Sequence, residues 1–194
     1  CGGSKMMTMG TGGTAGTYYG YGGVLGQYIK NHADINVTVV STDGSKANIQ
    51  GIQKGNYQLG TVQSDVMAYA WEGTRAFEEE GKTDSFRVVA GLYAESVQLV
   101  TMDPEIKKVA DLKGKSVSIG APGSGVYFNA IDVLEAAGLT EKDIKPQYQS
   151  FAGQVPVFWQ YLQTALQKGS SPLSAQCRHQ SVLLFRPKQI APNM

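Results

Sequence analysis

Apolar and polar positions along this chain follow two patterns, one typical of strands and the other of helices. Short β-branched or apolar runs predict strands, and apolar residues spaced three to four apart predict helices. The predicted strands are 5–9, 35–41, 59–62, 86–92, 97–102 and 115–119. The predicted helices are 18–31, a short helix after a turn within 43–54, 66–71, 108–112 and 126–137. Strands and helices that alternate in this way predict an α/β fold.

A loop rich in glycine and threonine joins the first predicted strand to the first predicted helix. Residues 9–20 read Met-Gly-Thr-Gly-Gly-Thr-Ala-Gly-Thr-Tyr-Tyr-Gly. Without Cβ atoms, such a loop leaves backbone N–H groups open to a ligand, and the helix dipole favours an anion there. A plain tight turn is the alternative, because the spacing matches neither a dinucleotide-binding fingerprint nor a Walker loop.

A second unit of the same kind lies about halfway along the chain. The predicted strand 115–119 leads into Gly120-Ala-Pro-Gly-Ser-Gly125, and the predicted helix 126–137 follows it. Two such units predict two α/β lobes, which we place at residues 1–103 and 104–194. Ligands of open α/β sheets bind beyond the carboxyl ends of the strands, so we expect a small anionic ligand in a cleft between the lobes.

The expected cleft residues come from these loops and from the ends of neighbouring strands. Tyr18 could equally pack in the core, and Ser45 could equally be a helix N-cap, as could Asp43. For the helix 66–71 we expect Ser64 or Asp65 as the N-cap, although Asp65 could instead bind a ligand amine. The predicted ligand-binding residues are Thr11, Gly12, Gly13, Thr14, Tyr18, Ser45, Gln63, Ser64, Tyr93, Gly123, Ser124, Gly125 and Val126.

The composition argues against several classes of function. The chain has 17 basic and 16 acidic residues and no basic stripe, which argues against a nucleic-acid partner. No apolar run approaches the length of a membrane span. Its two histidines, His32 and His179, stand near no nucleophile or metal-ligand motif. We therefore expect no catalytic residue, no metal and no cofactor.

The first residue is a cysteine. A chain that begins Cys1-Gly-Gly-Ser-Lys5 is what signal-peptide cleavage of a bacterial lipoprotein leaves, with lipid on Cys1 as the membrane anchor. A chain boundary that falls at a cysteine by chance is the alternative. A lipidated Cys1 cannot pair with Cys177, the only other cysteine, so we expect no disulfide.

Four segments together resemble one family of transport proteins. They are 10–19 (Gly-Thr-Gly-Gly-Thr-Ala-Gly-Thr-Tyr-Tyr), 62–66 (Val-Gln-Ser-Asp-Val), 90–100 (Ala-Gly-Leu-Tyr-Ala-Glu-Ser-Val-Gln-Leu-Val) and 111–125 (Asp-Leu-Lys-Gly-Lys-Ser-Val-Ser-Ile-Gly-Ala-Pro-Gly-Ser-Gly). From about residue 5 to Phe151 the chain resembles a TAXI-type solute receptor, the extracytoplasmic binding protein of an ion-driven TRAP transporter.

The resemblance implies a two-lobed periplasmic-binding-protein fold of type II. It implies a small organic acid as ligand, of the dicarboxylate or glutamate class, and the membrane subunits of a TRAP transporter as partners. It also implies a periplasmic or extracytoplasmic location. A ligand-sensing domain of the same fold, an enzyme that binds a phosphorylated substrate, and a non-functional truncated product are the alternatives.

The chain from about residue 152 departs from this family. Such receptors are longer, and their chain crosses back to complete the first lobe, whereas residues 152–194 show little periodicity. We therefore expect an incomplete second lobe and an incomplete return crossing. A divergent but genuine short receptor is the alternative.

Overall fold

The structure is a computed structural model that describes residues 5–101, 103–150 and 177–185. Its strands are β1 (Lys5–Gly10), β2 (Ile35–Val40), β3 (Leu59–Gln63), β4 (Arg87–Val97), β5 (Ser116–Ser118), β6 (Lys145–Gln147) and β7 (Cys177–Phe185). Its helices are α1 (Thr17–Ala33), α2 (Ser45–Lys54), α3 (Ser64–Glu72) and α4 (Gly125–Ala136), with 3-10 turns η1 (Arg75–Phe77), η2 (Val109–Leu112) and η3 (Glu141–Asp143). None of the helices described here combines the length and apolarity needed to cross a bilayer.

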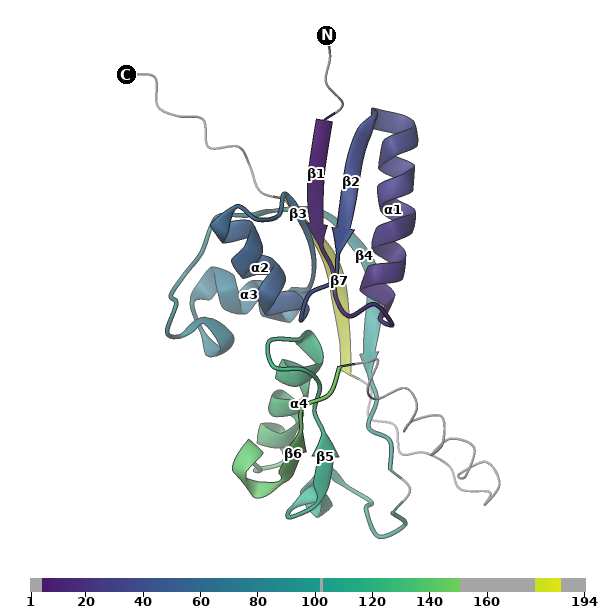
Figure 1. The fold of residues 1–194 in the computed structure, drawn as a ribbon. Helices are drawn as coiled ribbons and strands as arrows, with labels where there is room; N and C mark the ends of the chain where they lie inside the picture. Colours follow the sequence, from purple (N-terminus) through teal and green to yellow (C-terminus); the bar gives the residue numbers. More distant parts are fainter. Residues whose placement is uncertain (1–4, 102, 151–176, 186–194) are drawn as a thin grey trace, which may run out of the picture.

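The first lobe is built on a five-stranded sheet with helices on both faces (Figure 1). The strand order is β2-β1-β3-β7-β4, with β1 parallel to β2 and β3, and with β7 antiparallel to β3 and β4. On one face α1 packs against Met9, Leu59 and Leu183. On the other, α2 and α3 enclose a core that includes Ile49 and Val66.

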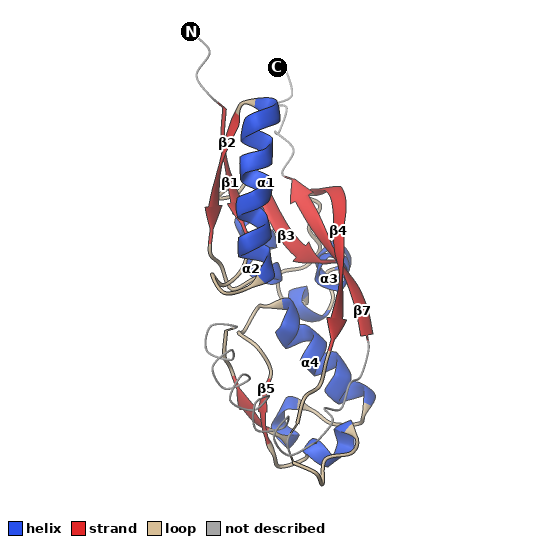
Figure 2. Ribbon diagram, turned by 90° about the vertical axis from the view of Figure 1, so that its right-hand side faces the viewer, coloured by secondary structure: helices blue, strands red, loops and turns tan. Residues whose placement is uncertain are grey.

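The second lobe is smaller and lies beyond the end of that sheet (Figures 1 and 2). Strands β5 and β6 pair in parallel, and α4 lies beside them. Its core joins buried side chains from the loops, η2 and α4, namely Ile106, Leu112, Ile119, Leu134, Leu139 and Ile144. Strand β4 leads from the first lobe toward the second, and β7 lies beside it (Figure 2).

Most predicted elements are confirmed within a few residues, but several sequence-based expectations are wrong. Residues 86–92 and 97–102 were expected to form two strands, whereas β4 is a single strand that spans the expected break. Its register against β7 shifts between Val88 and Ala90 and again between Gly91 and Ala94. Of the residues between the two expected strands, Ala94, Glu95 and Ser96 pair with β7 in regular register.

The expected helix caps are also wrong. Gly44 is the N-cap of α2, in place of Ser45 or Asp43. Gln63 is the N-cap of α3, in place of Ser64 or Asp65, and it makes no side-chain capping bond. Asp65 still satisfies one first-turn amide, because its Oδ1 accepts the Val66 N–H at 2.9 Å.

Strand β7 was not predicted, and it alters the expected division into lobes. Residues 104–194 were assigned to the second lobe, yet β7 lies inside the sheet of the first lobe, between β3 and β4. The chain therefore does return to the first lobe. Residues 151–176 and 186–194 lie outside the described residues, so the expected irregular tail beyond 152 is otherwise untested. Lipid on Cys1 and the absence of a disulfide stay predictions, because Cys1 also lies outside them.

Candidate ligand-binding site

A cleft of about 470 Å³ lies between the two lobes. The first lobe contributes the loops that follow β1 and β2, with single residues from the end of β3 and from β4. The second lobe contributes the loop between β5 and α4 and the chain after β6. The lining residues are Gly12, Gly13, Thr14, Gly16, Thr17, Tyr18, Ser41, Thr42, Asp43, Gly44, Ser45, Gln63, Glu95, Gly120, Ala121, Ser124, Gly125, Val126, Gln149 and Ser150.

Three helices begin at this cleft. The N-caps Gly16 of α1, Gly44 of α2 and Ser124 of α4 all line it. The first turn of a helix carries backbone N–H groups without intrahelical partners, and the helix dipole adds partial positive charge there. The cleft can therefore hold an anionic group through backbone donors from both lobes.

The structure brings most of the sequence-predicted residues together at the cleft. Those that line it are Gly12, Gly13, Thr14, Tyr18, Ser45, Gln63, Ser124, Gly125 and Val126. Those that do not are Thr11, Ser64, Tyr93 and Gly123.

Thr11 and Tyr93 belong to the packing behind the cleft. Thr11 is fully buried, and its Oγ1 donates to the Val40 carbonyl at 2.7 Å. The Tyr93 ring packs against the rings of Tyr18 and Tyr21, with centroids 6.4 and 5.7 Å apart. Both residues support the α1 side of the site without lining it.

Gly123 and Ser64 also lie off the cleft. The Gly123 carbonyl accepts the Lys46 N–H at 3.0 Å, so this residue joins the two lobes. Ser64 is the first residue of α3.

Two of the three predicted serines, Ser45 and Ser124, each accept a backbone N–H beside the cleft. Ser45 is almost fully buried, and its Oγ accepts the Gln63 N–H at 3.1 Å, which fixes the end of β3 against α2. Ser124 is the N-cap of α4, where its Oγ accepts the Tyr127 N–H at 3.1 Å. A hydroxyl can donate while it accepts, so both serines can still offer a proton to a ligand.

A buried asparagine holds the first-lobe loops in place. Asn48 Nδ2 donates to the carbonyls of Thr11 and Thr61 at 2.6 and 2.7 Å, and its Oδ1 accepts from Thr42 Oγ1 at 2.7 Å. These bonds use both of its donors and one acceptor site, so Asn48 supports the cleft floor and offers no donor to a ligand.

The sequence analysis did not identify the two acidic residues of the cleft as cleft residues. Glu95 and Asp43 both line it. Asp43 follows β2 in a strand–loop–helix arrangement like the two that were recognised, so the same signal could have found it. Glu95 lies on β4 just after an irregularity in register, where no sequence signal marked a site. The Tyr18 hydroxyl donates to Glu95 Oε2 at 3.4 Å, which orients the carboxylate beside the α1 N-terminus.

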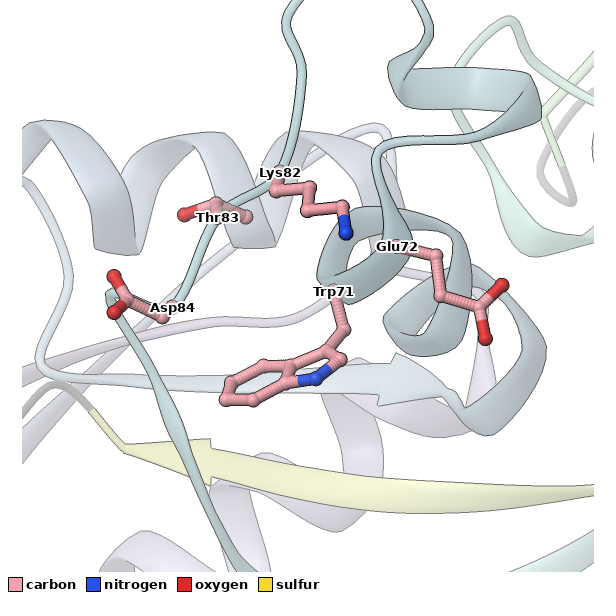
Figure 3. A pocket seen from close by; sticks show the side chains of 5 residues that line it. All are labelled: Trp71, Glu72, Lys82, Thr83 and Asp84. Atoms are coloured by element: carbon pink, nitrogen blue, oxygen red, sulfur yellow. The ribbon is translucent and has the colours of Figure 1, made fainter.

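A second hollow of about 690 Å³ is lined by Trp71, Glu72, Lys82, Thr83 and Asp84. Figure 3 shows the Glu72 and Asp84 carboxylates on opposite sides of the indole, pointing away from each other. These side chains do not converge on one point, so the interlobe cleft is the better candidate site. Within the described ranges no group of three or more His, Cys, Asp or Glu side chains is placed to hold a metal ion.

Solved structures share this fold. The alkanesulfonate-binding protein SsuA of Xanthomonas axonopodis pv. citri, bound to MOPS, is 16% identical with a TM-score of 0.60, over 97% of this chain and 68% of that one. PhnD1 of Prochlorococcus marinus, with methylphosphonate, is 13% identical with a TM-score of 0.60, over 96% of this chain and 78% of that one. The GluR0 ligand-binding core with L-glutamate is 10% identical with a TM-score of 0.58, over 97% of this chain and 88% of that one.

These matches show a mixed α/β fold of the two-lobed periplasmic-binding-protein kind. The chain spans about two thirds of the length of the sulfonate-binding proteins it matches, at 68% and 66%. A family model covers residues 9–161, which includes both cleft-forming loops. The chain belongs to the NMT1-like family.

Proposed function

We propose that this chain is an extracytoplasmic solute-binding receptor that holds a small organic acid or amino acid in the interlobe cleft. It passes that solute to the membrane subunits of a transporter, of the TRAP type by its resemblance to TAXI receptors. The observation that carries the proposal is the convergence of three helix N-termini from two lobes on one cleft. A ligand that touches both lobes stabilises the closed form, which is the differential affinity that lobe closure requires.

The charges of the cleft favour one ligand class. Its described lining contains Asp43 and Glu95 but no Lys, Arg or His. A dicarboxylate would meet two carboxylates without a cation to offset them. An amino acid fits better, because its carboxylate can lie at the helix N-termini while its ammonium group lies beside Glu95. We therefore favour an α-amino acid as the ligand.

The same lining favours binding over catalysis. None of the described lining residues is a cysteine or histidine, and two of the lining serines, Ser45 and Ser124, hold backbone N–H groups in place. No base lies beside either serine among the hydrogen bonds of the described cleft, as nucleophilic catalysis would need. We accordingly propose a receptor and not an enzyme.

A thermal-shift series tests this proposal. The purified chain is scanned with L-glutamate, L-glutamine, succinate, 2-oxoglutarate and methylphosphonate. A ligand at about 100 times its Kd adds about 2.7 kcal/mol to the free energy of unfolding, which raises Tm clearly. We expect an amino acid to do so. If none of these compounds shifts a cooperative transition, the proposed ligand classes are wrong.

Glu95→Gln then tests the ligand class. Loss of the carboxylate should weaken amino-acid binding by about tenfold or more, because a charge-assisted hydrogen bond is lost. Glu79→Gln, on an exposed side chain outside the cleft, is the matched control and should leave binding unchanged. Succinate binding that Glu95→Gln leaves unaltered or strengthens would instead identify a dicarboxylate receptor.

A further inference from the structure

The two lobes touch through a short chain of buried amides beside the cleft. Gln63 at the end of β3 donates from Nε2 to Asn129 Oδ1 on α4, at 3.0 Å. Asn129 Nδ2 donates in turn to Asp65 Oδ2 on α3, at 2.7 Å. Gln63 and Asn129 are only 5% and 4% exposed. These hydrogen bonds therefore run from the first lobe to the second and back, with Gln63 and Asn129 screened from water and Asp65 half-buried. We call these three residues the amide relay.

Asp65 fixes the direction of every bond in the amide relay. An ionised carboxylate can only accept, so Asn129 must turn its NH₂ group toward Asp65. The Asn129 oxygen then faces Gln63, so Gln63 must donate to it from its own NH₂ group. This leaves Gln63 Oε1 on the opposite side, against Gly125 at the start of α4: a Cβ added to Gly125 would lie 1.5 Å from this oxygen. Gln63 thus presents one defined face at the cleft that it lines.

Two backbone contacts beside the amide relay also form only when the two lobes lie close together. The Lys46 N–H on α2 donates to the Gly123 carbonyl of the second lobe at 3.0 Å. A Cβ added to Gly44 would lie 3.3 Å from the Ser124 Cα atom. Lys46 occupies the first turn of α2, where an amide has no partner within its own helix. This amide is therefore bonded only while the lobes are closed, as they are in this structure.

We propose that Asn129, which does not line the cleft, is a positioning residue for ligand binding. It holds the Gln63 carboxamide in one orientation and ties α4 to the first lobe, so it sets how far the closed form is populated. The link from closure to ligand affinity rests on the proposed receptor function. A closed form that is less populated lowers the apparent affinity by the same factor.

Exchanging the two polar groups provides the test. Asn129→Asp alone places a carboxylate next to Asp65 and should drive the lobes apart. Adding Asp65→Asn restores the pattern: the new asparagine donates to the carboxylate at position 129, which still accepts from Gln63. At position 65 the asparagine oxygen can still accept the Val66 N–H. The double variant should therefore rescue the single one.

The rate of amide hydrogen exchange, measured without ligand, shows whether the lobes separate in each variant. In Asn129→Asp the Lys46 N–H should exchange at least about tenfold faster than in the wild type, and in the double variant within about threefold of it. The control is the Asn48 N–H, which donates to the Gly44 carbonyl within the first lobe at 2.9 Å and should stay protected throughout. Unchanged exchange at Lys46 in Asn129→Asp, or failed rescue, overturns the proposal.

A second variant covers the case in which Asn129→Asp does not fold. Asn129→Ala removes the bridge without adding charge and must also speed exchange at Lys46 but not at Asn48. Loss of protection at both amides, or at neither, contradicts the proposal. These measurements use no ligand, so a failed ligand screen counts against the receptor function and leaves the amide relay standing. If L-glutamate binds the wild type, Asn129→Asp should raise its Kd by the factor by which the closed fraction falls, which is smaller than the rise in the exchange rate while the closed form predominates.

Discussion

At the scale of single residues, Gly125 shows how closely the lobes approach. Its predicted role was to offer a backbone N–H at the start of α4, which needs no particular side chain. The contact with Gln63 adds a steric requirement, because a Cβ at this position would overlap the carboxamide. The overlap is relieved when the Gln63 carboxamide turns away, which breaks its bond to Asn129, or when the lobes separate, and either change weakens the contact between the lobes.

Gly125→Ala should therefore act as a wedge. We expect the Lys46 N–H to exchange at least about tenfold faster, and ligand affinity to fall in proportion to the loss of the closed fraction. Gly20→Ala is the matched control, because a Cβ there meets nothing within 4 Å in α1. That change should leave exchange at Lys46 unaltered and add up to about 1 kcal/mol of stability. Equal exchange rates of the Lys46 N–H in Gly125→Ala and Gly20→Ala would contradict this prediction.

Asn48 gives a prediction about stability. Its Nδ2 donates to two buried carbonyls, so Asn48→Asp would replace that donor with an acceptor facing them. We expect a loss of about 3 kcal/mol, because both carbonyls lose the Asn48 amide donor and face an acceptor in its place, and the new acid is desolvated. Urea unfolding measures the change. Asn31→Asp, at an exposed position on α1 whose Oδ1 accepts from Gln27, should cost less than about 0.5 kcal/mol. Similar losses in both variants would contradict the role given to Asn48.

At the scale of elements, local pattern was sufficient wherever the chain alternates strand, loop and helix. β1, α1 and α4 were predicted because their apolar spacing and their flanking glycines are local signals. β7 was missed because its place depends on distant partners: it pairs with β3 at Leu59–Phe185 and with β4 at Val97–Cys177. The polar run Arg178-His-Gln-Ser181 also hides its strand character.

For the candidate site too, residues with a local sequence signal were predicted, and residues placed by distant contacts were not. Loops that begin helices carry their signal in glycine, serine and threonine, so most of them were found. Glu95 was missed because it reaches the cleft only through the path of β4 beside β7. Asn129 was missed because its partners, Gln63 and Asp65, lie more than sixty residues away and in the other lobe. Sequence reasoning finds cleft loops more readily than it finds the contacts that close the cleft.

The 3-10 turn η3 yields a prediction about pH. Asp143 accepts from the backbone N–H and the hydroxyl of Thr140, at 2.9 and 2.8 Å, and these bonds hold the pKa of its carboxyl below the usual 3.8. A carboxyl whose folded pKa is depressed stabilises the fold above its unfolded pKa, and this contribution is lost as pH falls through the folded pKa. NMR titration of Asp143 should give a midpoint below 3.8 in the wild type. Thr140→Val removes the hydroxyl donor and should move the midpoint upward; a midpoint that does not move would assign the shift to other groups.

At the scale of the whole molecule, two kinds of contact join the lobes along α3 and α4. One is the buried amide relay. The other is an exposed cluster in which Arg75 pairs with Asp132 at 3.2 Å and with Glu135. Tyr69 Oη also donates to Asp132, at 2.8 Å. Burial and the Asp132 carboxylate raise the pKa of Tyr69, so its hydroxyl keeps the proton that it donates.

The two kinds of contact should contribute unequally to closure. The Arg75 and Glu135 side chains are 45% and 46% exposed, and ion pairs of that exposure contribute up to about 1 kcal/mol, which is a factor of about five. Breaking a buried, charge-linked bond costs more. We therefore expect Arg75→Ala to speed exchange of the Lys46 N–H by less than about fivefold, against tenfold or more for Asn129→Asp.

Added salt distinguishes the contribution of the exposed ion pairs from that of the amide relay. About 0.5 M NaCl screens the exposed cluster but does not reach the amide relay, so exchange at Lys46 in the wild type should change by less than about fivefold. In Arg75→Ala the same salt should have almost no effect, because the screened pairs are already gone. A large salt effect in the wild type that disappears in Arg75→Ala would mean that the exposed ion pairs hold the lobes closed. Closure would then follow the ionic strength of the solution, whereas closure held by the amide relay depends on the fit between β3 and α4.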